Sequence, residues 1–272
     1  MTAADRPSSS IHQATDGAAY ERFLGRWTQR LALPFCDFAR LPSAGPVLEI
    51  GCGTGSLAFA LSQQRTEPIA AIDIAEPYIA FARACPGADR IAFELGDACH
   101  LRFADGSFAA SLAQLVLNFV PDPLAAVREM KRVTVRQGIV AGAIWDFRGG
   151  LVYQRLFWDT AAGIDTSAGA ARDRLFAHPL AQSAGLLDLW RQAGLAEIER
   201  SSLTIRMDYA DFNDYWGPLL MGQGPIGVYV QGLPPGLRQR LEERVRIAYL
   251  SGAPDGPRSM TATAWAVRGS VL

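Results

Sequence analysis

The chain has 272 residues, 49% of them hydrophobic, and its 26 Lys and Arg nearly balance 27 Asp and Glu, for a formal net charge of -1. This length suffices for one well-buried domain with insertions or for two small domains. The balanced charge provides no basic stripe that could follow a nucleic-acid backbone, so we expect neither DNA nor structured RNA as a partner. The first 17 residues are polar, and no stretch of about 18 uncharged apolar residues follows, which argues against a signal peptide and a membrane-spanning helix.

Strand-like and helical runs alternate along most of the chain, as in βαβ units. The expected strands cover about 46–50, 68–74, 91–96, 108–115 and 137–146, and the expected helices about 55–65, 76–84 and 122–133. After Gly150 a first insertion is expected, with a helix at 151–163 and then a Gly/Ala/Ser-rich stretch to about 171. A helix at 182–193 and strands at 197–205 and 259–267 resume the fold, and a second insertion between those strands contains the Gly222 to Gly227 turn and a helix at about 235–249. This order predicts an α/β fold: a doubly wound, mostly parallel seven-stranded sheet with helices on both faces and a helical lid.

The most informative segment is Val47-Leu48-Glu49-Ile50-Gly51-Cys52-Gly53-Thr54-Gly55, an apolar strand followed by glycine at every second position. Glycine permits positive φ and lets a ligand approach the backbone, and the first amides of the helix that begins at Ser56 would face that ligand. A dinucleotide fingerprint requires G-x-G-x-x-G, but Gly55 comes one residue early and Ser56 stands in the expected place. The segment therefore predicts an adenosine ligand other than a dinucleotide.

Two further acids follow the next two strands. Asp73 lies 18 residues past Gly55, where a carboxylate can accept hydrogen bonds from both ribose hydroxyls. Asp97 follows the strand at 91–96, within Phe93-Glu94-Leu95-Gly96-Asp97-Ala98. Residues 18–147, and above all these acids and glycines, resemble the class I S-adenosylmethionine-dependent methyltransferases and are similar to the methyltransferase type 11 group.

The resemblance implies S-adenosylmethionine as the cofactor and S-adenosylhomocysteine as its product. It assigns Asp97 and the amide of Ala98 to adenine, and it places Gln114 and Leu115 beside the methionine arm; Ile74 would offer the adenine ring an apolar face. The full set of expected cofactor residues is Tyr20, Arg26, Glu49, Gly51, Cys52, Gly53, Gly55, Asp73, Ile74, Asp97, Ala98, Gln114 and Leu115.

The segment Tyr20-Glu21-Arg22-Phe23-Leu24-Gly25-Arg26-Trp27 resembles the N-terminal helix that closes over the cofactor in many members of the family. An arginine can pair with the carboxylate of the methionine end through two hydrogen bonds. Tyr20 and Arg26 are the preferred candidates, with Arg22 as the alternative, although an arginine on such a helix can also be a solvated surface residue.

The chain departs from the family pattern at two positions. Ala109 stands where members usually carry Asp, which bears on loop anchoring. Asn118 stands where many carry His, so a histidine base is excluded at that site.

Methyl transfer is an in-line displacement that depends on alignment and on the exclusion of water. We expect lid or substrate elements at 18–40, 150–181 and 210–255, within one domain that spans 18–272. The insertions carry aromatic residues that suggest a small, apolar or aromatic acceptor, with core packing as the competing interpretation; they are Tyr153, Phe157, Trp158, Phe176, Tyr215, Trp216 and Tyr229. If the acceptor needs a general base, the order of candidates is His178, Asp146 and His100.

The cysteines Cys36, Cys52, Cys85 and Cys99 show no metal-ligand spacing. A disulfide at Cys52 would obstruct the glycine turn, so we expect free thiols in a reducing compartment. The expectation is therefore a cytoplasmic protein with a flexible N-terminus at 1–17, no metal and a small-molecule partner.

Two other functions stay open at this point. A non-catalytic S-adenosylmethionine-binding protein would keep the same acids and glycines. A nicotinamide-dependent oxidoreductase is disfavoured by the early Gly55 and by the lack of a Tyr-x-x-x-Lys pair.

Overall fold

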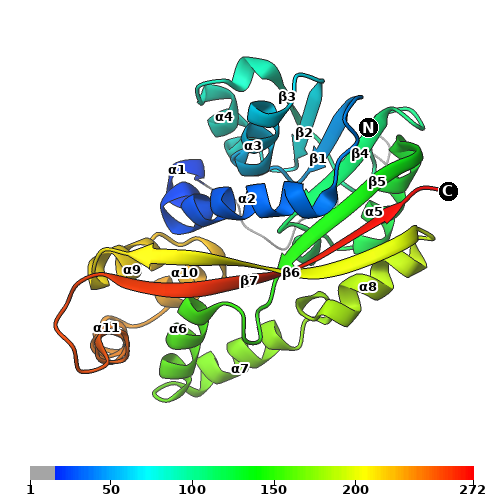
Figure 1. The fold of residues 1–272 in the computed structure, drawn as a ribbon. Helices are drawn as coiled ribbons and strands as arrows, with labels where there is room; N and C mark the ends of the chain where they lie inside the picture. The colour runs from blue at the N-terminus through cyan, green and yellow to red at the C-terminus, as the bar shows by residue number, and fades with distance from the viewer. Residues whose placement is uncertain (1–15) are drawn as a thin grey trace, which may run out of the picture.

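A computed structural model describes residues 16–272, and within them one seven-stranded sheet has the strand order β3-β2-β1-β4-β5-β7-β6 (Figure 1). The strands are β1 (Val47–Ile50), β2 (Ile69–Asp73), β3 (Ile91–Leu95), β4 (Phe108–Gln114), β5 (Thr134–Trp145), β6 (Ala196–Tyr209) and β7 (Arg258–Ser270). Strands β1 to β5 pair in parallel, and β7 is antiparallel to both β5 and β6. The predicted α/β class and the mostly parallel sheet are confirmed.

Helices cover both faces of the sheet, which is why β1 and β4 are buried along their whole length. Val47 packs in one core with α2 (Arg26–Ala39), α3 (Ser56–Gln64) and α4 (Glu76–Ala84). The next residue, Leu48, points to the other face and packs in the core that contains α5 (Pro123–Val133) and α8 (Ser183–Gln192). This alternation is the period of two expected of a strand.

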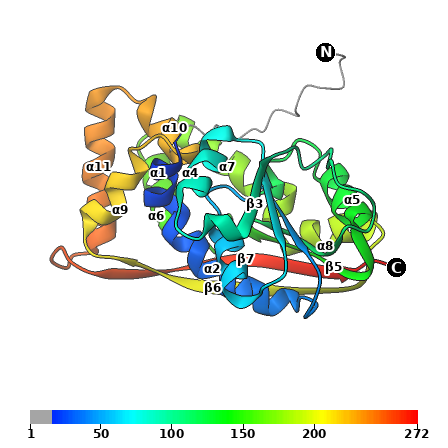
Figure 2. The same ribbon diagram turned by 90° about the horizontal axis from the view of Figure 1, so that it is seen from above.

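The last two strands are longer than the sequence predicted, and one end of their paired region extends beyond the other strands of the sheet. Trp145, the last residue of β5, pairs with Ala264, whereas β6 and β7 remain paired as far as Tyr209 and Arg258. A two-stranded ribbon therefore projects past β5. Helices α9 (Phe212–Leu219), α10 (Gly224–Gln231) and α11 (Pro235–Leu250) follow β6, and Figure 2 shows them at the same end of the molecule as α1 (Gly17–Tyr20).

The structure contains two helices in the insertions that the sequence analysis did not assign. The Gly/Ala/Ser-rich stretch after α6 (Val152–Ala162) forms most of α7 (Thr166–Phe176). The side chain of Asp165 caps α7 by accepting the amide of Ser167 at 2.9 Å. The predicted turn at Gly222 to Gly227 gives way to α10 at Gly224, where Pro225 occupies the first helical turn.

The sequence predicted a flexible segment at 1–17, of which residues 1–15 lie outside the described residues. Gly17 already belongs to α1, because the side chain of Asp16 accepts the amides of Ala18 and Ala19 at 2.8 and 3.2 Å. A π-helical turn at Glu21–Gly25 then joins α1 to α2.

Most aromatic residues of the insertions form a core between α6, α9 and the ribbon. The ring of Trp216 stacks on Phe157 and on Phe212, with centroids 6.2 and 6.0 Å apart. Tyr215 is buried, and its hydroxyl donates to the carbonyl oxygen of Tyr153 at 2.9 Å. Core packing, the competing interpretation, accounts for these side chains.

Candidate functional site

The glycine run forms a cradle between β1 and α3. Gly51, Gly53 and Gly55 have φ angles of 63°, 54° and 94°, in the left-handed region that disfavours other residues. A Cβ at Gly51 would lie 2.1 Å from Val116 Cγ2, so packing also requires glycine there. A Cβ at Gly53 would meet only Tyr78, at 3.9 Å. The backbone at Gly53 therefore borders open space.

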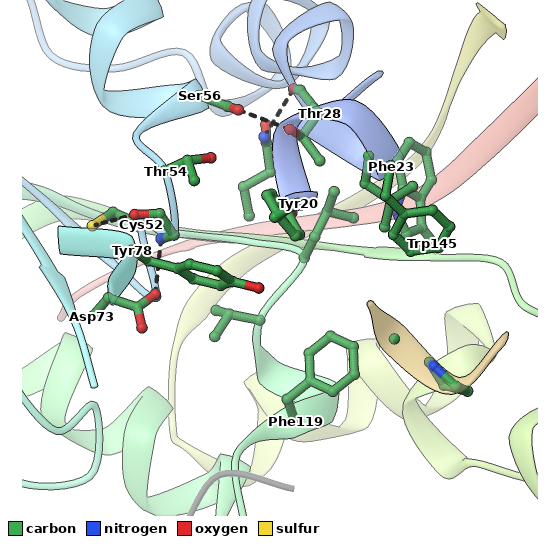
Figure 3. Close-up of a pocket in the computed structure, with 18 of the residues that line it drawn as sticks. Tyr20, Phe23, Thr28, Cys52, Thr54, Ser56, Asp73, Tyr78, Phe119 and Trp145 are labelled. Atoms are coloured by element: carbon green, nitrogen blue, oxygen red, sulfur yellow. Dashed lines mark hydrogen bonds between the residues drawn. The ribbon is translucent and has the colours of Figure 1, made fainter. Parts of the chain in front are cut away.

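A cavity of about 110 Å³ lies over this cradle (Figure 3). Figure 3 shows Asp73 and Cys52 on one side of it and Phe23 and Trp145 on the other. Its lining includes eight of the residues predicted to hold the cofactor: Tyr20, Glu49, Gly51, Cys52, Gly53, Asp73, Gln114 and Leu115.

Asp73 ends β2 beside the cradle. Its Oδ2 accepts the amide of Gly53 at 2.8 Å, and its Oδ1 accepts the amide of Ala75 at 2.9 Å. Burial raises the pKa of Asp73, while these amide donors act to lower it. Each carboxylate oxygen still has a lone pair for a further donor. Asp73 is thus a fixed acceptor in the cavity wall.

Two other acceptors in the wall lack partners among the described residues: Glu49 Oε2 and Gln114 Oε1. Both side chains are buried, at 2% and 7% exposure, and Gln114 is held by a bond from its Nε2 to the Thr28 carbonyl oxygen at 3.1 Å. Burial raises the pKa of Glu49 well above its ordinary value. Buried acceptors without donors are rare in native proteins, so both atoms fit a ligand that brings a cation or N–H groups.

The N-terminal helices lie over the cradle and are hydrogen-bonded to it. The hydroxyl of Thr28 lies 2.7 Å from that of Ser56, and the Thr54 hydroxyl donates to the Glu21 carboxylate. The ring of Tyr20 lies 5.1 Å from that of Tyr78. Tyr20 therefore lies in the cavity wall, and its contact with a cofactor stays a prediction.

Arg26 and its alternative Arg22 do not line this cavity. The Nη1 of Arg26 is 2.8 Å from Asp214 Oδ1, and its guanidinium lies 4.3 Å from the Trp27 ring. Arg22 is exposed. The geometry therefore gives Arg26 a bond between α2 and α9, and we assign it no role toward a cofactor carboxylate.

The remaining predicted cofactor residues, Gly55, Ile74, Asp97 and Ala98, are not among the residues that line this cavity. Gly55 is the N-cap residue of α3. Asp97 accepts the Cys99 amide at 2.9 Å, and its Oδ2 is 3.2 Å from His100 Nδ1. The adenine assignment of Asp97 and Ala98 stays a prediction.

A second cavity, of about 620 Å³, adjoins the first. The two share five lining residues, which are Phe119, Phe147, Leu175, Gly224 and Pro225. The other residues that line the second cavity are Asn118, Trp158, Ser167, Ala171, Arg174, His178, Val228 and Tyr229. The protein therefore offers two adjoining compartments with a common wall.

His178 lines this second cavity. Its Nδ1 accepts the amide of Leu180 at 3.2 Å, so the neutral ring carries its proton on Nε2. Burial lowers the pKa of His178, which favours that neutral form. Nε2 is then a hydrogen-bond donor, and the geometry does not favour a general base.

The other two candidates for the base line neither cavity. Asp146 accepts the amides of Arg148 and Gly149 in a turn. His100 is on the surface, with its side chain 79% exposed.

Sequence reasoning did not single out several polar residues of the walls. Trp145 and Gln154 line the first cavity, and Ser167 and Arg174 line the second. The signal was a helical period: Ser167, Ala171, Arg174 and Leu175 recur at the spacing of one helix face. The small residues of that stretch hid the period.

In residues 16–272, no three His, Cys, Asp or Glu side chains are placed to hold a metal ion. The four cysteines are free. Over the same residues, none of the helices has the length and apolar character needed to cross a membrane.

The model of the methyltransferase domain family matches residues 48–142. Demethylmenaquinone methyltransferase of Roseiflexus castenholzii is 38% identical over 101 residues, or 37% of this chain and 42% of that protein. The 27-O-demethylrifamycin SV methyltransferase of Amycolatopsis mediterranei is 30% identical over 162 residues, or 58% of this chain and 54% of that protein. The chain thus spans about half the length of these curated relatives.

Phosphoethanolamine N-methyltransferase 2 of Haemonchus contortus, whose structures contain S-adenosylhomocysteine or S-adenosyl-L-methionine, shares the fold with a TM-score of 0.57. The identity is 14%, and the match covers 94% of this chain and 57% of that one. The glycine cradle with Asp73, the family match over residues 48–142 and the fold all agree with the resemblance to the class I S-adenosylmethionine-dependent methyltransferases.

Proposed function

We propose that the protein transfers a methyl group from S-adenosylmethionine to a small organic molecule. The cradle cavity would hold the cofactor, and the second cavity would hold the acceptor. The observation that carries this proposal is the common wall of the two cavities at Phe119, Phe147 and Leu175, because methyl transfer requires both molecules side by side without water between them.

The residues of the cradle fit the cofactor. Asp73 would accept the ribose hydroxyls, since its two oxygens are held in place by backbone amides. Glu49 Oε2 and Gln114 Oε1 would accept the ammonium group of the methionine end, which would supply the donors that both atoms lack among residues 16–272. Asp97 and Ala98 keep their proposed place at the adenine.

The protein's contribution to the reaction would be to position and enclose the reactants. When bound, the cofactor supplies a methyl group on a positively charged sulfur. The elements predicted as lids, at 18–40, 150–181 and 210–255, would close over the two cavities. The Nε2–H of His178 would donate a hydrogen bond to an oxygen or nitrogen of the acceptor.

Calorimetric titration with S-adenosylmethionine, S-adenosylhomocysteine and NADH, side by side, tests the cofactor. We expect about micromolar dissociation constants for the first two, or roughly 8 kcal/mol of binding free energy, and no heat with NADH. Binding of NADH, or of none of the three, would refute the proposal.

Turnover is tested separately with S-adenosylmethionine that carries a tritiated methyl group. Purified protein is incubated with a panel of small aromatic and aliphatic alcohols, phenols, acids and amines, and label in the extracted product is counted. We expect transfer to at least one class, lost on heat denaturation. Cofactor binding without transfer to any of them would favour the non-catalytic alternative. The cytoplasmic location stays a prediction of the sequence.

A further inference from the structure

We propose that the methyl acceptor is an apolar organic anion whose negative group binds Arg174 at the mouth of the second cavity. This inference rests on the proposed function, because it takes that cavity as the acceptor site. It concerns the class of substrate, which the cofactor site does not determine.

Arg174 belongs to one face of α7 that borders the cavity. Ser167, Ala171, Arg174 and Leu175 all line it, at the spacings that place residues on one side of a helix. His178 follows α7 and lines the same cavity. The guanidinium is therefore carried on a regular element and not on a loose loop.

The charge of Arg174 is not neutralised by the protein. Among the described residues it has neither an ion pair nor a hydrogen-bonded partner. Arg172, on the same helix, differs: it lies 3.0 Å from Asp159 and 2.9 Å from Asp173. Carboxylates are thus available to the neighbouring arginine, while Arg174 keeps its donors for another molecule.

Acidic side chains do not offset this charge inside the cavity. Its lining residues include no Asp or Glu. The nearby Asp165 already accepts the Ser167 amide at 2.9 Å and the hydroxyls of Ser167 and Tyr229, both at 2.6 Å. The carboxylate of Asp165 is therefore hydrogen-bonded to residues of α7 and α10. An amine with a positive charge would meet an unpaired arginine, whereas an anion would gain a charge-assisted hydrogen bond.

The rest of the wall suits an apolar body. Trp158, Phe119 and Phe147 line the cavity, and Val228 stands at its rim with 56% of its surface exposed. The Nε2–H of His178, which lines the same cavity, adds a donor to the site of Arg174. The site thus combines aromatic surface with donors, as an organic acid requires.

The test uses two fluorescent probes that share one aromatic skeleton: anionic 1-anilinonaphthalene-8-sulfonate and neutral N-phenyl-1-naphthylamine. Dissociation constants are measured for the wild type, Arg174→Gln and the matched control Arg172→Gln. We expect Arg174→Gln to weaken binding of the sulfonate about tenfold or more and to leave the neutral probe unchanged. Arg172→Gln should leave both probes unchanged.

A third variant, Ala171→Trp, fills the cavity and should weaken both probes. Unchanged affinity for the sulfonate in either Arg174→Gln or Ala171→Trp would overturn the proposal, as would equal loss of both probes in Arg174→Gln. Calorimetry with S-adenosylhomocysteine is run on every variant. Retained cofactor binding with no Arg174 effect refutes only the anionic acceptor, whereas failure of the wild type to bind cofactor refutes the proposed function.

Discussion

Replacing Asp73 with alanine gives the sharpest test of the cofactor site. The carboxylate accepts amides from Gly53 and Ala75 and, in our proposal, the two ribose hydroxyls. A hydrogen bond to a charged group contributes about 1.5–3 kcal/mol. Water can solvate one of the two ribose hydroxyls, so we count the loss of one such bond. The dissociation constant should then rise about 10- to 150-fold.

The assay is titration calorimetry with S-adenosylhomocysteine, and thermal unfolding without ligand is followed in parallel. Asp73→Ala also leaves the Gly53 and Ala75 amides without their acceptor, so its melting temperature should fall. Asp73→Asn keeps one carbonyl oxygen and should fall between wild type and alanine in affinity. Asp188→Ala, a surface substitution at a carboxylate that is 54% exposed, is the control and should change neither quantity. A wild-type affinity in Asp73→Ala would refute the ribose assignment.

Three further predictions concern the lid, the buried acid and the histidine. Glu49→Gln should stabilise the ligand-free protein above pH 4.5, because burial raises the pKa of Glu49 above that ordinary value and the charged form costs folding free energy as pH rises. Thermal melts from pH 4 to 8 should show a melting temperature that changes less with pH than in the wild type, and cofactor binding should be weaker. An unchanged dependence of the melting temperature on pH would contradict the burial argument. His178→Gln should retain methyl transfer within about tenfold and mainly raise the acceptor KM, whereas loss of a general base would cost about 10²–10⁴-fold in kcat; steady-state kinetics decide. The pair of Arg26 and Asp214 is partly exposed, so Arg26→Gln and Asp214→Asn should each lower the free energy of unfolding by about 1 kcal/mol or less in chemical denaturation. Both variants should have equal and small effects on cofactor affinity. A large loss of affinity in Arg26→Gln alone would support the predicted contact of Arg26 with the cofactor carboxylate.

The sequence by itself determined the sheet, the glycine cradle and the place of Asp73 beside it. These features are local, since an apolar strand, a glycine turn and a helix follow one another within residues 47–64. Strand periodicity then repeats the unit, so Asp73 falls at the carboxyl end of the next strand, beside Gly53. Local pattern is enough where each contact joins neighbouring elements.

Only the tertiary structure decided which side chains of the elements predicted as lids face the two cavities. Arg26 binds Asp214, 188 residues away along the chain, and no local pattern could distinguish that partner from a cofactor carboxylate. Phe157 and Trp158 are neighbours in sequence, yet only Trp158 lines the second cavity. The wall that joins the two cavities takes residues from four separate segments, at Phe119, Phe147, Leu175 and Gly224 with Pro225. Such contacts depend on how distant elements pack, and packing is the information that a local sequence pattern does not contain.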